Sequence, residues 1–328
     1  MGTHNIDLFL ANLAPNLRGL LFALSENVLE SLEEIRLRKL RPLAICRRGK
    51  TYFVTPNGEL SLEPTAGYLV SHGDLMVTVQ LISKSSLYVF EEELKQGFLT
   101  LPGGYRVGVA GQFILSNRRI IGIKEISSLN FRLAREIIGC ATPLLPRLVD
   151  TKGRPYSTLI VSPPQCGKTT LLRDLARQLS YGSPSLGLVR SQVVVVDERS
   201  EIAGVYDGVP QMDVGPCTDV LDACPKPEGI LMAIRSLAPD VIVTDEVGTS
   251  EDVAALQEAV NAGVRVFSSV HAGSWQELEK RPSLQPLLTN ETFTQAVLLS
   301  RRRGPGTIEG ILRLTQLAMY NTEVAQGV

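Results

Sequence analysis

The chain has 328 residues, which exceeds the roughly 100–200 residues of one typical domain, so two domains are expected. With 44% hydrophobic and 20% charged residues it can bury a sizeable core, which excludes an intrinsically disordered chain. Lysine and arginine number 33 against 34 acidic residues, and this balance argues against a protein that mainly coats nucleic acid.

The chain begins with a predicted helix and a set of short strands. Over residues 6–30, leucine and valine recur at spacings of three and four, which places them on one helical face. From Glu34 the period changes to two, and short strands are expected over 42–46 and 51–55.

A second helix and further strands follow. Ser71 and Asp74 have the spacing of a capping box, which predicts a helix from there to about Gln96. Several short strands are expected over 105–133, and a helix over 135–149. Residues 1–150 therefore predict a smaller α+β N-terminal domain.

Residues 151–328 predict a second domain with a parallel sheet. Continuous apolar runs alternate with helical segments, as a sheet with both faces covered requires. The strands are expected at 158–161, 193–196, 241–243 and 264–267, and the helices at 168–180, 226–237 and 250–262. The predicted fold class is α/β, with a RecA-like P-loop ATPase core.

The segment SPPQCGKTT joins the first of these strands to a helix, which is the context of a P-loop. Backbone N–H groups and the helix dipole would face the phosphates of ATP there, with Lys168 at the surface of the site reaching the β- and γ-phosphates. The Thr169 hydroxyl would coordinate magnesium, and Gly167 would let the backbone approach closely. Ser162 stands where the usual pattern has its first glycine. The predicted nucleotide-binding residues are Ser162, Pro163, Pro164, Gln165, Cys166, Gly167, Lys168, Thr169 and Thr170.

Two further strands are predicted to end in acidic residues. The strand VIVTDE ends in Asp245, a candidate magnesium ligand, and Glu246, which could orient water. The strand VVVVDERSE ends in Asp197, Glu198 and Glu201, and a hydrolytic site needs such a carboxylate to position the attacking water. Salt bridging with Arg199 and its neighbours is the structural alternative for this acidic cluster.

A histidine ends the last predicted parallel strand, VRVFSSVHAGS. His271 lies there in a loop of small residues, where it could sense the γ-phosphate or serve only the structure.

The order of the four motifs along the chain resembles that of the secretion ATPase superfamily. Its members are the hexameric motors of type II and type IV secretion and of type IV pili. The motifs are a Walker A segment at 162–169, an acidic box at 197–201, a Walker B strand at 241–246 and a histidine box at 269–272. The resemblance implies that Glu201 activates water, that Glu246 is the Walker B glutamate and that His271 is the histidine-box residue. The residues themselves leave open which of Glu198, Glu201 and Glu246 activates water.

Within that superfamily the chain resembles the stage III sporulation protein AA family of endospore-forming bacteria. The likeness rests on EEIRLRKLRPL (33–43), LPGGYRVGVAG (101–111), PPQCGKTTLLRDLAR (163–177), VDERSEIAG (196–204), TDVLDACPK (218–226) and SLAPDVIVTDEVG (236–248). After Glu246 the chain reads VGTSED, where the bulk motors carry an arginine and an aspartate, so their mechanochemical details do not transfer directly.

The resemblance implies an ATP-hydrolysing motor that uses ATP and Mg²⁺. It would form a homo-oligomer, a hexameric ring, and power a secretion-like channel complex between mother cell and forespore. Integral membrane components of that complex would recruit it, and no nucleic acid is expected as a partner. The first domain would lie over the nucleotide of a neighbouring subunit, where Arg106 and Arg132 could reach phosphates or could instead pair with acids of their own domain. Weaker candidates are Arg135 and the run 301–303, which is expected to be a solvated strand or turn face.

Cellular location follows from two absences in the sequence. Five cysteines without C-x-x-C spacing predict neither a disulfide framework nor a zinc site, which fits a reducing compartment. No apolar run approaches the roughly 18–20 residues that span a bilayer, and the N-terminus lacks the pattern of a signal peptide. We therefore expect a cytoplasmic protein. The resemblance to the sporulation family implies a place on the mother-cell side, peripheral to the membrane through a partner.

Two other classes of function share parts of this pattern. A RecA- or helicase-type nucleic-acid ATPase has the same order of strands, but it should carry basic or aromatic loops that stack bases, and aromatic residues make up only 5% of this chain. A nucleotide-gated scaffold without hydrolysis is disfavoured by the intact acids at 201 and 246.

Overall fold

A computed structural model describes residues 3–83, 97–116, 119–133, 136–289 and 292–314. The chain forms two compact units, Met1–Arg135 and Glu136–Val328. The division lies earlier than the boundary at residue 150 that the sequence predicts, because Leu144, Leu145 and Leu148 are buried in the core of the second unit.

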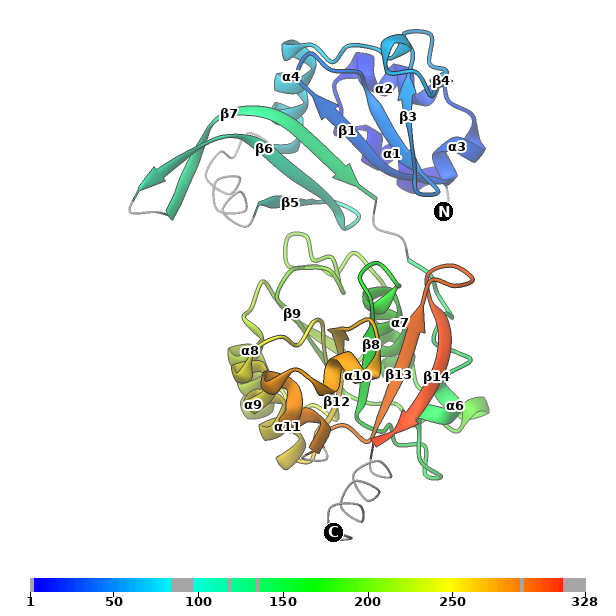
Figure 1. The fold of residues 1–328 in the computed structure, drawn as a ribbon, viewed down its shortest axis with the longest axis vertical. Coiled ribbons are helices and arrows are strands. Elements are labelled where there is room, and N and C mark those ends of the chain that lie inside the picture. The colour runs from blue at the N-terminus through cyan, green and yellow to red at the C-terminus, as the bar shows by residue number, and fades with distance from the viewer. Residues whose placement is uncertain (1–2, 84–96, 117–118, 134–135, 290–291, 315–328) are drawn as a thin grey trace. The chain divides into compact units, whose positions relative to one another are not determined.

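The first unit is built on an antiparallel sheet with the strand order β4-β3-β2-β1-β7-β6-β5 (Figure 1). The strands are β1 (Leu32–Arg38), β2 (Ala44–Arg47), β3 (Lys50–Val54), β4 (Leu60–Ser61), β5 (Phe98–Leu101), β6 (Tyr105–Ser116) and β7 (Arg119–Arg132).

The prediction of several short strands over 105–133 is wrong, since β6 and β7 form one long hairpin. Bulges shift its register without ending either strand. At one of them a side chain on Gly111 would place its Cβ 1.9 Å from the carbonyl oxygen of Glu125, so the partner backbone approaches too closely for any residue but glycine.

Helices supply the rest of this unit's core: α1 (Thr3–Leu10), α2 (Pro15–Phe22), α3 (Glu26–Glu30) and α4 (His72–Ser83). The 3₁₀ turn η1 (Pro64–Ala66) has no buried residue. The single helix predicted over 6–30 is broken, and Pro15 starts a new helix at its first position. The capping box is confirmed: the Asp74 N–H donates to Ser71 Oγ (3.1 Å) and the Ser71 N–H donates to Asp74 Oδ2 (2.8 Å). The part of this predicted helix that approaches Gln96 lies outside the described residues.

The second unit contains a sheet with the order β10-β9-β11-β12-β8-β13-β14. All neighbouring strands are parallel except β13 and β14. The strands are β8 (Thr158–Ser162), β9 (Val193–Asp197), β10 (Thr218–Asp222), β11 (Val241–Thr244), β12 (Arg265–His271), β13 (Gln295–Ser300) and β14 (Thr307–Arg313). The four predicted parallel strands are therefore confirmed.

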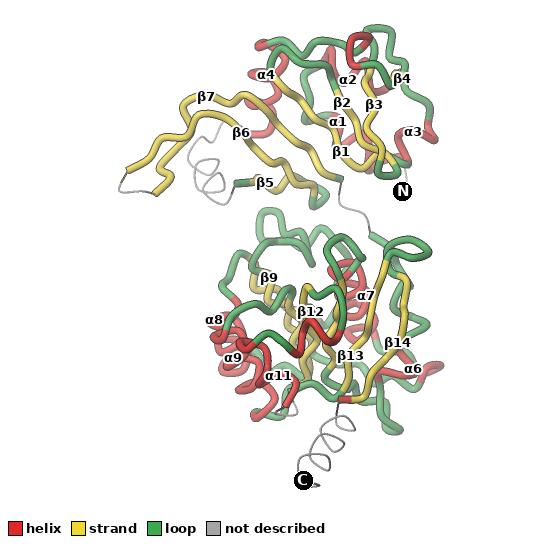
Figure 2. Tube along the Cα trace, viewed as in Figure 1, coloured by secondary structure: helices red, strands yellow, loops and turns green. Residues whose placement is uncertain are grey.

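Helices cover both faces of this sheet, as Figure 2 shows by the red segments around the yellow strands. They are α6 (Leu145–Leu148), α7 (Lys168–Tyr181), α8 (Lys226–Ser236), α9 (Ser250–Asn261), α10 (Trp275–Glu279) and α11 (Gln285–Thr289), with 3₁₀ turns η2 (Pro184–Leu186) and η3 (Pro282–Leu284). The three helices predicted at 168–180, 226–237 and 250–262 are confirmed. Along β9, Val193 and Val195 pack on the side of α7, while Val194 and Val196 pack on the side of α8 and α9. This two-sided burial explains why the strand reads as a continuous apolar run.

The helix predicted over 135–149 is largely absent: within the described residues 136–149, α6 is the one helical segment. Gly139 has a φ of +85°, and the Asp174 carboxylate accepts hydrogen bonds from the N–H groups of Gly139 (3.0 Å) and Ala141 (2.8 Å). These bonds hold the segment against α7 in a non-helical form. Among the described helices, none combines the length and the apolar character needed to cross a membrane.

Candidate active site

The predicted P-loop lies at the carboxyl end of β8, and α7 begins directly after it with Lys168. Gln165 and Gly167 have φ values of +59° and +88°, so the loop turns through two left-handed residues before the helix starts. Glycine at the second of these positions avoids the cost of a left-handed side chain and leaves the helix N-terminus open to an approaching phosphate.

Lys168 is buried beneath the loop, with 4% of the residue exposed. Its ammonium donates to the Pro163 carbonyl oxygen (3.3 Å) and lies 2.8 Å from His271 Nδ1. Burial lowers the pKa of Lys168, and the charges of Asp245 and Glu246 oppose that shift. The expectation that this lysine lies at the surface is wrong, because in this structure the side chain folds back under the loop to meet the end of β12.

Asp245 lies where the end of β11 meets the start of α7. Its Oδ2 accepts a hydrogen bond from the Thr169 hydroxyl (2.7 Å), and its Oδ1 accepts one from the Ser269 hydroxyl (2.5 Å). Adjacent hydroxyl and carboxylate oxygens are the ligands that Mg²⁺ takes beside a nucleotide, so the residues present fit this ion.

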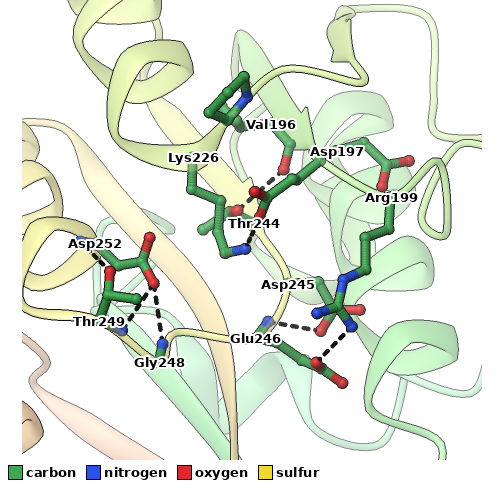
Figure 3. A network of polar contacts seen from close by, with 12 residues as sticks. Val196, Asp197, Arg199, Lys226, Thr244, Asp245, Glu246, Gly248, Thr249 and Asp252 are labelled. Carbon is green, nitrogen blue, oxygen red and sulfur yellow. Dashed lines mark hydrogen bonds and ion pairs between the residues drawn. The ribbon is translucent and has the colours of Figure 1, made fainter. Parts of the chain in front are cut away.

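Glu246 follows with a φ of +33° and has a partner at each carboxylate oxygen. Its Oε1 lies 2.5 Å from His271 Nε2, and its Oε2 lies 3.2 Å from Arg199 Nη1, a pair that Figure 3 shows at the front of the site. Behind this turn, Asp252 accepts from the N–H groups of Gly248 and Thr249, each at 3.0 Å, and so fixes the backbone that follows the glutamate.

His271 connects the lysine of the P-loop to this glutamate. Because an ammonium group can only donate, the Lys168 contact makes Nδ1 of the imidazole an acceptor. The ring proton then lies on Nε2 and is donated to Glu246. A neutral imidazole in this tautomer joins the P-loop, β11 and β12 in one chain of polar contacts.

The loop after β9 is organised by Asp197, which is 1% exposed. Its carboxylate accepts from the N–H groups of Glu201 (2.8 Å), Ile202 (2.9 Å) and Ala203 (2.9 Å). Burial raises the pKa of Asp197 to about 6, although the backbone hydrogen bonds act in the opposite direction. Asp197 therefore shapes the loop that presents Glu201.

Arg173 on α7 fixes the same loop from the other side. This buried guanidinium donates from Nε to the Ile202 carbonyl oxygen (2.5 Å) and from Nη2 to that of Glu201 (2.6 Å). The backbone of Glu201 is thus held both at its N–H and at its carbonyl.

A cavity joins the acidic loop to the end of β11. It is lined by Asp197, Glu198, Arg199, Glu201, Lys226, Thr244, Asp245 and Glu246. Figure 3 shows Lys226 reaching from α8 toward the end of β9, where its ammonium forms an ion pair with Glu198. The salt bridging expected for the acidic cluster exists, but it joins Glu198 to Lys226 and Arg199 to Glu246.

The structure thus brings together most of the residues predicted for the second domain. Lys168, Thr169, Asp245, Glu246 and His271 are linked by direct contacts, and Glu201 lies on the same cavity as Glu246. Sequence reasoning missed Arg173, Lys226 and Ser269. Only Ser269 carried a signal, as a hydroxyl two residues before the histidine at the end of the same strand.

The two arginines proposed in the first unit lie opposite each other on β6 and β7. The Arg106 guanidinium stacks on the Phe98 ring, 3.8 Å from its centroid. Arg132 Nε lies 3.5 Å from Glu34 Oε1, and its side chain is 59% exposed. Pairing with an acid of the same domain, the structural alternative, is therefore present for Arg132. Arg135 lies outside the described residues.

The arginine run 301–303 forms the turn between β13 and β14 and is exposed. The expectation of a solvated turn is confirmed, and within it Arg301 Nη1 lies 3.2 Å from Oε1 of the P-loop residue Gln165.

Comparison with known proteins places this site in a family. The model of the family described as sporulation stage III, protein AA, matches residues 6–316. The chain belongs to this family. It is 43% identical over 299 residues to stage III sporulation protein AA of Bacillus subtilis (strain 168), covering 91% of this chain and 92% of that protein.

Solved structures share the fold at lower identity. The ATPase DotB of Yersinia pseudotuberculosis matches with a TM-score of 0.60 at 14% identity, over 92% of this chain and 81% of that one. The pilus retraction motor PilT with bound ADP matches with a TM-score of 0.54 at 14% identity, over 83% and 76%. The predicted α/β fold class with a RecA-like P-loop ATPase core is therefore confirmed.

Proposed function

We propose that this protein hydrolyses ATP and converts that energy into work on a secretion-like complex during sporulation. One observation carries the proposal: Lys168, Thr169, Asp245, Glu246 and His271 converge from three separate strand ends and are joined by direct contacts. A P-loop lysine and a hydroxyl–carboxylate pair beside it are parts that phosphoryl transfer requires. The histidine–glutamate pair joins them to the ends of β11 and β12.

The geometry suggests how each group acts on ATP. The P-loop backbone and the Lys168 ammonium bind the phosphate oxygens, which draws Lys168 away from His271 Nδ1. Thr169 and Asp245 would hold Mg²⁺, and the ion would supply positive charge against the β- and γ-phosphates. Glu201 orients a water molecule and accepts its proton as the water oxygen bonds to the γ-phosphorus and the bond to the β-phosphate oxygen breaks. The products are ADP and inorganic phosphate.

Assembly and partners form the second part of the proposal. The chain works as a homo-oligomer, a hexameric ring, in which Arg106 and Arg132 of one subunit approach the nucleotide of the next. It lies on the cytoplasmic, mother-cell side and is recruited by integral membrane components of a channel complex. Membership of the sporulation family and the fold shared with DotB and PilT support this part.

Replacement of the P-loop lysine tests the proposed activity. In Lys168→Ala we expect ATP affinity to fall by about a hundredfold or more, because several charge-assisted hydrogen bonds to phosphate are lost. Binding is measured by titration calorimetry and turnover by phosphate release, with circular dichroism as the check on folding. Lys152→Ala removes an exposed lysine from a turn of the same unit and should leave both values unchanged.

Two results would count against the proposal. Wild-type turnover in a folded Lys168→Ala protein would exclude hydrolysis at this P-loop. Turnover that depends on added single-stranded DNA or RNA would indicate a nucleic-acid motor in place of a secretion motor.

A further inference from the structure

The turn between β13 and β14 lies against the P-loop of its own chain. Strands β13 and β8 are parallel neighbours, so their carboxyl ends meet at one edge of the sheet. There the Gly306 N–H donates to the Cys166 carbonyl oxygen at 2.8 Å. A Cβ on Gly167 would lie 3.3 Å from the Gly306 nitrogen, so the two backbones are in close packing contact. The turn is thus fixed to the loop that cradles phosphates.

The three arginines of this turn have different surroundings. Arg302 donates two hydrogen bonds to the Glu309 carboxylate, from Nε to Oε1 (3.1 Å) and from Nη2 to Oε2 (3.2 Å). This pairing lowers the pKa of Glu309. Arg301 contacts Oε1 of Gln165, a neutral amide. In the parts of the chain that the structure describes, no carboxylate forms an ion pair with Arg301. Its positive charge therefore lies beside the P-loop without a matching negative charge.

We infer that Arg301 is a phosphate-binding residue of its own subunit's nucleotide site. Gln165 holds the guanidinium at the loop in the absence of nucleotide, and a phosphate oxygen replaces the amide when ATP binds. A guanidinium fits this role because it keeps its charge and donates from several nitrogens at once. The inference deepens the proposed ATPase function and rests on it.

The position of Arg301 changes what the sequence alone predicts about the source of a second positive charge at the phosphates. From the sequence, the motif loops of the second domain offer no obvious arginine besides Arg199 of the acidic box, which favours a cation supplied by a neighbouring subunit. Arg301 is distant from the P-loop in sequence, and the pairing of β13 with β8 brings it there. A positive charge beyond that of Lys168 is therefore available within one subunit.

The test compares two arginines of the same turn. Arg301→Gln should weaken binding of both ATP and inorganic tripolyphosphate by about tenfold or more, the effect of losing one charge-assisted hydrogen bond. Arg303→Gln makes the same change of charge at an exposed position two residues away and should stay within about twofold of wild type. Calorimetric titration with each ligand measures both variants, and thermal unfolding without ligand checks that both fold.

Tripolyphosphate separates phosphate binding from contact with the base. Unchanged tripolyphosphate affinity in a folded Arg301→Gln protein would overturn the inference, even if ATP affinity fell. Mixing Arg301→Gln chains with Glu201→Gln chains tests which subunit's nucleotide Arg301 contacts. We expect no recovery of turnover in the mixture. Restored turnover would mean that Arg301 acts on the nucleotide of a neighbour, and this result would also overturn the inference. A wild-type chain that binds ATP without hydrolysing it would overturn the proposed function and leave the effect of Arg301 on affinity in place.

Discussion

Three carboxylates compete for the role of orienting water, and the way their backbones are held distinguishes them. Glu198 is paired with Lys226, and Glu246 is paired with both His271 and Arg199. Glu201 has its backbone fixed by Asp197 and by Arg173, while its side chain lines the cavity shared with Glu246. A carboxylate on a fixed backbone at the edge of the phosphate site suits general-base work, because its position is set before the substrate binds.

Glutamine at these positions tests the assignment with a matched pair of variants. Glu201→Gln should retain ATP affinity and lose turnover by about 10²–10⁴-fold, the usual contribution of a general base. Glu198→Gln removes the same charge from the same loop and should affect turnover far less, because that carboxylate serves the ion pair with Lys226. Phosphate release and calorimetric titration measure both variants. A larger loss of turnover in Glu198→Gln than in Glu201→Gln would reverse the roles.

At the level of elements, the sequence predicts best what is buried on both sides. Strands β8, β9, β11 and β12 are central in the parallel sheet, and their continuous apolar runs identify them. The sequence does not predict the edge strands. β10 reads TDVLD and is half-exposed, and among the described strands β14 pairs with β13 alone. An edge strand needs no continuous apolar sequence, because only part of it faces the core.

The residues of the candidate site also divide into those that the sequence predicts and those that it does not. Residues in motifs with a fixed spacing, such as Lys168, Thr169 and Asp245, could be predicted because the chemistry requires them at strand ends. Arg173 and Gly306 could not, because their contacts with the acidic loop and with the P-loop depend on which strands become neighbours. No local pattern encodes that arrangement.

The loop after β9 should respond to pH through Asp197. Burial raises the pKa of this carboxyl to about 6, so it takes up a proton as the pH falls through about 6, well above the range of an ordinary aspartate near 4. An opened loop would expose the carboxyl to water and return its pKa toward the ordinary value near 4, so the closed loop binds the proton more tightly than the opened one. Proton uptake below about pH 6 therefore stabilises the closed loop. We expect the hydrogen-exchange protection factors of the Ile202 and Ala203 amides to rise between pH 7 and 5.

Two controls accompany this pH experiment. The Val195 amide, in the central strand β9, should keep its protection over the same range. Constant protection of the Ile202 and Ala203 amides from pH 7 to 5 would show that Asp197 does not titrate there or does not hold the loop.

At the scale of the whole molecule, the first unit holds two arginines on neighbouring strands that could bind an anion together. Arg106 and Arg132 face each other across β6 and β7, and like charges directly opposite in a sheet are unfavourable. Glu34 lies opposite Arg132 on β1 and pairs with it, but Glu34 also binds Arg36 at 2.6 Å. We propose the phosphates of a nucleotide held by a neighbouring chain as the anion that these two guanidinium groups bind.

A shared site would make hydrolysis depend on assembly. Turnover per chain should rise with protein concentration as rings form, while a site complete in one subunit would give constant turnover. Arg106→Ala should lower turnover on the order of a hundredfold or more, as the loss of an arginine that stabilises the transferring phosphoryl group does. Arg41→Ala, at an exposed position of the same unit, should have no such effect. Phosphate release measured over a dilution series, with light scattering for mass, follows both quantities.

Mixing two inactive variants shows which chain supplies each group. In an equal mixture of Arg106→Ala and Glu201→Gln chains, a productive site needs Glu201 from an Arg106→Ala chain and Arg106 from its Glu201→Gln neighbour. If chains assort at random around a closed ring, about a quarter of the sites meet both conditions. The mixture should therefore recover about a quarter of wild-type turnover, although each variant alone is nearly inactive. Turnover that is independent of concentration, with no recovery on mixing, would mean that Arg106 acts within its own chain or only supports the sheet.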